Sequence, residues 1–226
     1  MGDPTVAAVV IVRNGSKRLL RAIESIRRQT HPVDQLVIAV DPSTDDTLAI
    51  ARRVGGAEVL EPSHESGIAN ARNRSIAACQ TRWVAFLDHD DIWRSDKIER
   101  QLTLAEGSGA MVCTGLIALF AESAEAVSPQ LRDRLDLPPR LGLTPSAIMV
   151  RRSLFDQIGG FDPSMEIGCD SDWIARADRA RWATVDDVVV DKELHEFNIS
   201  TDTARNGREM LRLVRRHLER QRNRGG

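Results

Sequence analysis

The chain has 226 residues, and its 31 Lys and Arg against 33 Asp and Glu give a formal net charge of −2. This length favours one sizeable core over two domains, and the near-neutral charge gives no reason to expect a nucleic-acid partner. No segment approaches the roughly 20 apolar residues of a membrane span, and no secretion signal begins the chain, so we expect a cytoplasmic protein. The three cysteines are odd in number and far apart, which predicts reduced core thiols at Cys79, Cys113 and Cys169.

Strand-like and helix-like segments alternate along the first half of the chain. Residues 6–12 form a near-continuous run of Val, Ala and Ile, typical of a strand buried on both faces, and the pattern repeats at 36–40, 58–60 and 83–87. Apolar residues at helical spacing lie between these runs, at 19–26 and 48–54. Such alternation predicts right-handed crossovers and an α/β fold with a mostly parallel sheet flanked by helices.

The second half of the chain is less regular. Residues 121–143 are rich in Ser, Pro, Arg and Glu, which predicts a long loop or short-helix excursion of the kind that covers a binding site. A strand is predicted at 147–150, and helices are predicted at 152–158 and 172–180. Residues 208–224 form a strongly basic helical pattern, which predicts a solvated helix packed on its own domain or, alternatively, a peripheral contact with anionic lipid or a protein.

Acidic residues follow the apolar run that ends at Leu87, at Asp88, Asp90 and Asp91. In an extended strand Asp88 and Asp90 point the same way, close enough to serve one divalent cation. Carboxylates at the end of a buried strand repel one another unless they are neutralised, and Mg²⁺ or Mn²⁺, which prefer oxygen ligands, would do so. The alternative is that Asp91 caps a helix that runs through Asp96 and Lys97, while the other acids are solvated.

A succession of short motifs extends this pattern along the chain. In order they are Arg13-Asn14, the Asp41 to Thr47 segment, the Gly67 to Asn73 segment, Leu87 to Asp91, Gly159 to Asp162, Asp170 to Trp173, and His195 to Ser200. Their order and spacing resemble family 2 glycosyltransferases of the GT-A fold. The resemblance implies a Rossmann-like sheet, a nucleotide over the carboxyl ends of the first strands, a metal that bridges the diphosphate to the aspartate motif, and transfer with inversion.

The resemblance also assigns residues on the donor side. It implies that Asp41 and Arg72 bind the nucleotide together with Asp88, that Arg13 stacks on the base, and that His195 completes a metal sphere made by Asp88 and Asp90. Arg72 lies four residues from both Ile68 and Ile76, so its charge falls in the apolar stripe of its own helix and needs a partner. Simpler roles stay open: a turn acid at Asp41, a surface arginine at Arg13, a structural pair of Arg72 with Asp41 or Asp88, and a structural His195.

The acceptor side depends on two acids. The resemblance places Asp170 on the family's catalytic base, with Asp172 as the second candidate, although Cys169 replaces the usual glutamate and Ser171 the usual aromatic residue. The alternative for Asp170 is an N-cap of the helix predicted to start at Asp172. We expect one domain over 1–226, with a nucleotide-sugar-binding half at 5–120, an acceptor-binding half at 121–200 and a helical tail at 201–226.

These assignments predict a metal-dependent glycosyltransferase that moves a sugar from a nucleotide-diphosphate sugar to an acceptor hydroxyl. The acceptor class stays open among saccharides, lipid-linked saccharides, natural products and proteins. One alternative is a catalytically inactive nucleotide-sugar-binding or scaffold protein, suggested by Cys169. Nucleotidyl transfer is disfavoured because residues 13–16 do not form a glycine-rich basic loop.

Overall fold

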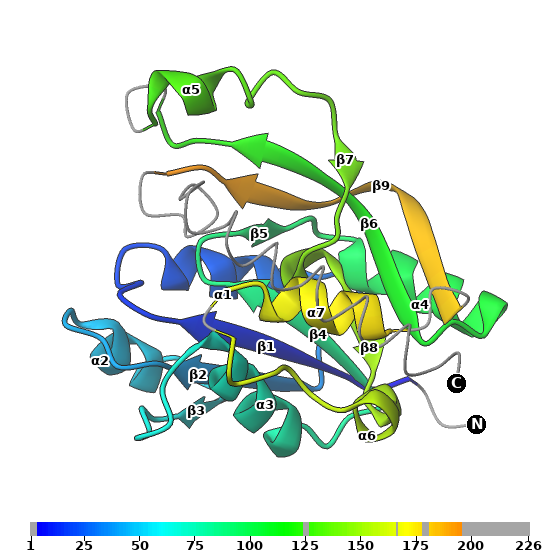
Figure 1. The fold of residues 1–226 in the computed structure, drawn as a ribbon, viewed down its shortest axis with the longest axis horizontal. Helices are drawn as coiled ribbons and strands as arrows, with labels where there is room; N and C mark the ends of the chain where they lie inside the picture. Colours follow the sequence, from blue (N-terminus) through cyan, green and yellow to red (C-terminus); the bar gives the residue numbers. More distant parts are fainter. Residues whose placement is uncertain (1–3, 124–126, 166, 178–180, 196–226) are drawn as a thin grey trace, which may run out of the picture.

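The computed structural model describes residues 4–123, 127–165, 167–177 and 181–195. Within these residues the chain builds a nine-stranded sheet in the order β3-β2-β1-β4-β8-β6-β9-β5, with β7 paired to β6 (Figure 1). Helices cover both faces of this sheet. The predicted α/β architecture is therefore confirmed.

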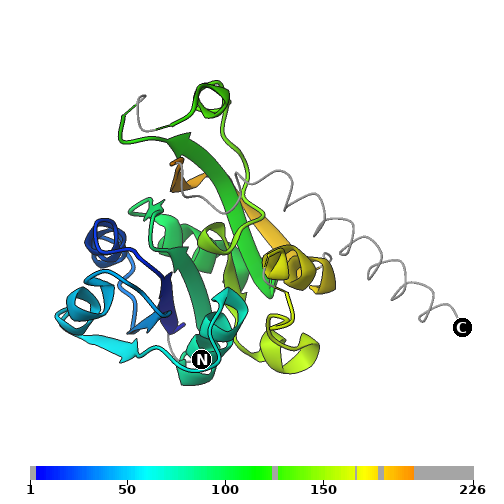
Figure 2. The same cartoon turned by 60° about the vertical axis from the view of Figure 1, so that its left-hand side comes forward.

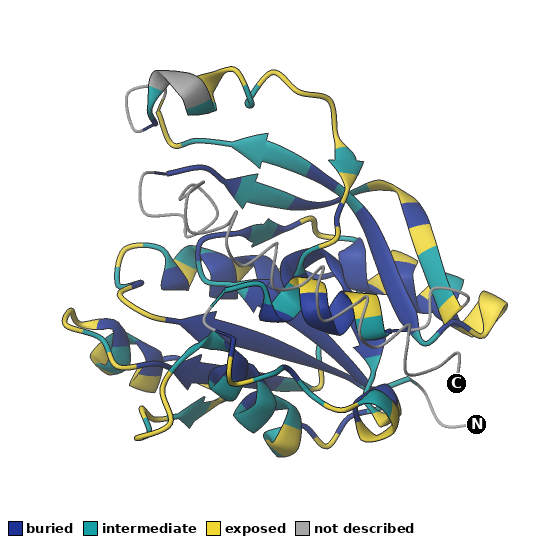
Figure 3. Cartoon of the chain, in the orientation of Figure 1, coloured by how far each residue is buried: buried dark blue, intermediate teal, exposed yellow. Residues whose placement is uncertain are grey.

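The first half of the sheet is parallel, as predicted. Its strands are β1 (Val6–Val12), β2 (Gln35–Val40), β3 (Ala57–Leu60) and β4 (Trp83–Asp88). The helices that connect them are α1 (Leu19–Arg27), α2 (Thr47–Arg52) and α3 (Ile68–Ala78). Every residue of β1 is buried, because β1 lies in the middle of these strands with helices on both of its faces (Figure 3).

Alternate residues of the strands feed two separate cores. Val6, Ala8 and Val10 of β1 point to the face where α1 and α4 (Lys97–Ser108) contribute Leu19, Ile23, Ile98 and Leu102. Ala7, Val9 and Ile11 point to the face covered by α3, α6 (Ser153–Ile158) and α7 (Cys169–Arg176), where Phe155 and Trp173 pack against Phe86 and Phe161. The period of two in the strands therefore divides the apolar side chains between the two layers of helices.

The second half of the sheet differs from the sequence prediction, which did not anticipate β6 (Val112–Phe120), β9 (Trp182–Glu193) or β5 (Ile92–Trp93). Strand β8 (Met149–Arg151) joins the two halves by antiparallel pairing with both β4 and β6. Strands β6 and β9 then pair in parallel with two register shifts, and Asp186 and Asp187 are exposed. These irregularities interrupt the apolar alternation from which β9 could have been recognised.

In its described part, residues 121–123 and 127–143, the predicted excursion has little regular structure. It contains α5 (Pro129–Arg132) and β7 (Arg140–Leu141), and η2 (Pro145–Ala147) returns the chain to β8. It rises from the end of β6 and stands apart from the first four strands (Figure 2), and much of its surface is exposed (Figure 3). The excursion thus lies on the β6 side of the sheet and not over the first four strands (Figure 2).

Some predictions fall outside these described segments. The basic helix at 208–224 and the residues Asn198 and Ser200 belong to this group. No helix of the described segments has both the length and the apolar character that membrane crossing requires. The division into donor and acceptor halves stays a prediction.

Candidate functional site

Three carboxylates converge where β4 ends. Oxygen atoms of Asp88, Asp90 and Asp91 all lie within 4.8 Å of one another. The prediction that one site unites Asp88 and Asp90 is confirmed in geometry, but the reasoning from an extended strand is wrong. The chain turns after Asp88, with the amide of Asp91 donating to the Asp88 carbonyl at 3.0 Å, and this turn brings all three acids together.

Asp91 is the most deeply buried member of this acid cluster. It has no solvent exposure and does not cap a helix, because α4 begins at Lys97 with Asp96 as its N-cap. Its carboxylate accepts from the Ser146 hydroxyl at 2.6 Å and from Lys192 Nζ at 3.0 Å. Burial raises the pKa of Asp91 to about 7; Lys192 opposes this shift, whereas the charges of Asp90 and Asp88 add to it.

Asp90 contacts the histidine that the sequence placed in the metal sphere. His195 Nε2 lies 2.9 Å from Asp90 Oδ2, and both residues are largely buried. Burial alone would raise the pKa of Asp90, but the hydrogen bond to His195 and the nearby charge of Lys192 hold it below its usual range. The structure thus brings together all three predicted metal ligands, Asp88, Asp90 and His195.

The end of β9 supplies groups that the sequence analysis missed. Lys192, whose Nζ is also 3.8 Å from Asp88, meets the acid cluster, and the buried Glu193 accepts from Arg18 at 2.8 Å and from Arg21. Burial would raise the pKa of Glu193, but the bonds from Arg18 and Arg21 lower it. These ion pairs tie β9 to α1 and hold the end of the strand that contains Lys192 and precedes His195. These residues could have been found from the sequence only by recognising strand β9, whose end lies beside the acid cluster.

Arg72 links the acid cluster to the proposed acceptor side. It is almost fully buried, and its guanidinium pairs with Asp88 at 3.2 Å and with Asp170, while Cζ lies 5.2 Å from the centre of the Phe161 ring. The expected need for a partner is confirmed. The partners are Asp88 and Asp170, whereas Asp41 accepts a hydrogen bond from the Gly67 amide.

Asp170 lies in the first turn of α7. This helix starts at Cys169 with Gly168 as its N-cap, so the N-cap interpretation of Asp170 is wrong and the predicted helix start at Asp172 is three residues late. The side chain of Asp170 remains 32% exposed. Asp172, by contrast, is nearly fully buried and accepts from Arg176 Nε at 2.8 Å. The two candidate bases therefore have different surroundings, and Asp170 is the accessible one.

Asp41 and Arg13 lie at the ends of neighbouring strands. Both oxygens of the buried Asp41 carboxylate accept from the Gly67 amide, at 3.0 and 3.2 Å, which anchors the start of α3. Arg13 follows β1 and is exposed. Because β1 separates β2 from β4, Asp41 and Asp88 lie two strand spacings apart, roughly 10 Å. This distance suits the two ends of one nucleotide diphosphate.

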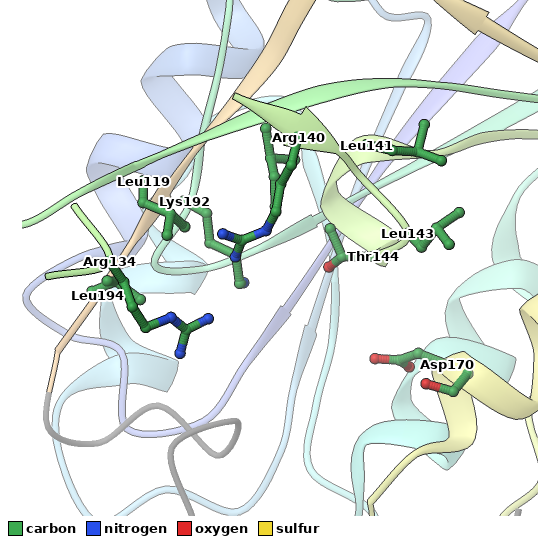
Figure 4. Close-up of a pocket in the computed structure, with 11 residues that line it drawn as sticks. Leu119, Arg134, Arg140, Leu141, Leu143, Thr144, Asp170, Lys192 and Leu194 are labelled. Carbon is green, nitrogen blue, oxygen red and sulfur yellow. The ribbon is translucent and has the colours of Figure 1, made fainter. Parts of the chain in front are cut away.

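A cavity of about 320 Å³ opens beside Asp170. Asp170 and Ser171 of α7 line the cavity, together with Lys192 and Leu194 at the end of β9 and with Arg134, Arg140 and Leu119. In Figure 4, Leu141 and Leu143 lie on the same side as Asp170, and Arg134 and Lys192 lie away from it. Residues of the excursion thus line this cavity together with α7 and the end of β9. Asp170 and Lys192 both line this cavity, and Lys192 also contacts the acid cluster.

The chemistry of the acid cluster fits a divalent metal. Asp88, Asp90 and Asp91 offer oxygen ligands, and His195 offers an imidazole beside Asp90. Carboxylates are the ligands that Mg²⁺ and Mn²⁺ prefer, and an added imidazole is compatible with Mn²⁺. Asp88 is 24% exposed at this site, so a ligand can approach it from solvent. Asp91 is already occupied by Ser146 and Lys192, which leaves Asp88 and Asp90 as the principal candidates.

Comparison with known sequences agrees with the motif order. Residues 7–159 match the model of the family described as glycosyl transferase family 2. The pre-mycofactocin glycosyltransferase of Mycobacterium tuberculosis is 34% identical over 182 residues, which cover 74% of this chain and 37% of that protein. The succinoglycan biosynthesis protein ExoO of Rhizobium meliloti is 31% identical over 140 residues, covering 57% of this chain and 40% of that protein.

A further relative is named for its donor and acceptor. The UDP-Glc:alpha-D-GlcNAc-diphosphoundecaprenol beta-1,3-glucosyltransferase WfaP of Escherichia coli is 30% identical over 103 residues, covering 45% of this chain and 41% of that protein. This chain therefore spans less than half the length of these three relatives. Among solved structures, S. aureus TarS 1–349 in complex with UDP-GlcNAc has a TM-score of 0.68 at 18% identity, covering 88% of this chain and 61% of that one, which supports a shared fold.

Proposed function

Because this chain belongs to glycosyl transferase family 2, we propose that it transfers a sugar from a nucleotide-diphosphate sugar to an acceptor hydroxyl. One observation supports this most strongly: Arg72 joins Asp88 of the acid cluster to Asp170, which lines an open cavity. The buried Arg72 side chain therefore connects the acids that could bind a metal and the donor diphosphate to Asp170, which could bind the acceptor.

The residues divide between the two substrates. Asp41 lies where its carboxylate can accept a hydrogen bond from a ribose hydroxyl or a base N–H. The exposed Arg13, just after β1, can stack on the base. Asp88 and Asp90, with His195 beside them, would hold Mn²⁺ or Mg²⁺, which supplies positive charge to the leaving diphosphate. The buried Arg72 keeps Asp88 oriented toward this site.

Asp170 is our candidate for the general base. Its carboxylate accepts the proton of the acceptor hydroxyl as that oxygen attacks the anomeric carbon, and the bond from this carbon to the diphosphate oxygen breaks. Attack from the face opposite the leaving group inverts the configuration. Asp172 is a poorer candidate, because its buried carboxylate is held by Arg176.

Uridine nucleotides are the first donors to test. WfaP is named for UDP-glucose, and TarS, which shares the fold, was solved with UDP-GlcNAc. We propose to measure the melting temperature of this chain with UDP, in the presence and absence of Mn²⁺, and then the release of UDP from UDP-glucose and UDP-GlcNAc. A ligand that binds the folded state raises its melting temperature. If neither UDP nor another nucleoside diphosphate stabilises the chain with Mn²⁺, the proposed function is wrong.

An inactive sugar-nucleotide-binding protein is the second candidate. The observation that favours it is the pairing of Asp170 with Arg72, which occupies one oxygen of the proposed base, next to Cys169 in place of the family's glutamate. This candidate predicts stabilisation by metal and UDP with no UDP release from any UDP-sugar. Release that depends on Asp170 excludes it.

A further inference from the structure

Lys192 lies between the acid cluster and the cavity. Its Nζ donates to Asp91 at 3.0 Å and is 3.8 Å from Asp88 Oδ2, and the residue also lines the cavity beside Asp170. Burial alone would lower the pKa of Lys192, but the charges of Asp91, Asp88 and Asp90 raise it above its usual value. Lys192 therefore holds a positive charge against the carboxylates that are the candidate metal ligands.

The two carboxylate oxygens of Asp88 face different cations. Arg72 donates to Oδ1 at 3.2 Å, and Oδ2 is the oxygen that Lys192 faces. A metal ion bound to Oδ2 at the usual distance of about 2.1 Å would therefore lie no more than about 6 Å from Nζ. A divalent cation and an ammonium repel each other at that separation, and because the Lys192 side chain is only 19% exposed, solvent screens this repulsion weakly.

A diphosphate has the opposite relation to Lys192, because its charges are negative. It would be attracted both by the metal ion and by the ammonium, which it can meet from the cavity side. Lys192 thus opposes a metal ion that arrives alone and favours a diphosphate that arrives alone. Once the diphosphate is bound, its own negative charges attract the metal ion and offset the repulsion from Lys192.

We propose that Lys192 sets the order in which metal and donor are loaded: it weakens the binding of the metal alone and strengthens that of the diphosphate, so the metal enters with the donor. This inference rests on the proposed function, since it concerns the donor of the same site. It gives the end of β9 a role in donor binding that the aspartate motif at the end of β4 does not supply.

The test compares two proteins that both contain Asp91→Asn, one with Lys192 and one with Lys192→Met. The first substitution removes the buried carboxylate that Lys192 neutralises, so the loss of Lys192 leaves no unpaired acid at this position. The electron paramagnetic resonance signal of free Mn²⁺ gives the affinity for Mn²⁺ alone, and titration calorimetry gives the affinity for UDP without metal. We expect the loss of Lys192 to tighten Mn²⁺ binding at least about tenfold and to weaken UDP binding at least about tenfold.

The opposite signs of these two effects separate the proposal from a structural role. Loss of a lysine that only supports the end of β9 would lower both affinities or change neither, and either result overturns the proposal. If one of the two proteins does not fold, Lys192→Gln in the otherwise unaltered chain gives the second comparison, with the same two signs expected. The matched control is Arg53→Met, which removes an exposed positive charge at the C-cap of α2 and should change neither affinity.

Two outcomes separate this inference from the function on which it rests. If the unaltered chain binds UDP with Mn²⁺ but the loss of Lys192 leaves the affinity for Mn²⁺ alone unchanged, the inference is wrong while the proposed function stands. If the unaltered chain binds no nucleoside diphosphate with Mn²⁺, the proposed function fails and the inference fails with it.

Discussion

Replacing Lys97 by Met should stabilise the protein most at neutral and mildly acidic pH. Lys97 is the first residue of α4 and is completely buried. Its Nζ donates to Gln101 Oε1 at 2.7 Å and lies 4.5 Å from the centre of the Trp93 ring. Burial lowers the pKa of Lys97 from 10.5 to about 7, and the charge of Cys113 opposes this shift.

The sign of the pH effect follows from proton linkage. Between about pH 7 and pH 10.5 the unfolded chain binds a proton at Lys97 that the folded chain lacks, so the free energy of unfolding rises with pH across this window. Below about pH 7 the folded chain carries the full free-energy cost of burying the charged Lys97 ammonium. At 1.36 kcal/mol for each pH unit, the gap between the two pKa values corresponds to a pH-dependent difference of roughly 5 kcal/mol between the two proteins.

Urea unfolding of both proteins between about pH 6 and pH 9 measures how this difference falls with pH, with the fluorescence of the four tryptophans as the probe. Burial also raises the pKa of Cys79, Cys113 and Cys169 to about 12, so both proteins lose stability above about pH 9. Because Cys113 interacts electrostatically with Lys97, the comparison is made below about pH 9. The control is Lys17→Met, which removes an exposed lysine. Parallel curves for Lys97→Met and the unaltered protein would refute the cost assigned to the buried ammonium.

Three further predictions concern the site. Arg72→Met should lower the free energy of unfolding by about 2–4 kcal/mol in urea, because Asp88 and Asp170 lose a buried partner; unchanged stability would contradict the structural importance of the pair. Asp90→Asn should preserve the fold but abolish the Mn²⁺-dependent stabilisation by UDP in a thermal-shift assay, and a variant that keeps it would exclude Asp90 as a ligand. Asp170→Asn should reduce turnover by at least about a hundredfold with little change in donor affinity, whereas full turnover would transfer the role of base to another group.

Several parts of the fold and site could be predicted from local sequence. The strands β1, β2 and β4 are continuous apolar runs, because each is covered by helices on both faces, and their bounds were predicted to within one residue. The acid cluster was visible because Asp88, Asp90 and Asp91 directly follow such a strand. Arg72 was recognisable because a charge within an apolar helical stripe must find a partner. Each of these features is encoded within a few adjacent residues.

The groups that complete the site are not encoded beside the acids: His195 was predicted only through the family resemblance, and Lys192 was not predicted. Lys192 and His195 reach Asp91 and Asp90 from more than a hundred residues away, through a strand whose register shifts and exposed acids hide its apolar period. The sequence specified the acids at the end of β4, but only the pairing of β9 with β6 and β5 decided which cations would face them. The physical reason is that a strand's pattern records which faces are buried, whereas its neighbours are selected by contacts across the whole sheet.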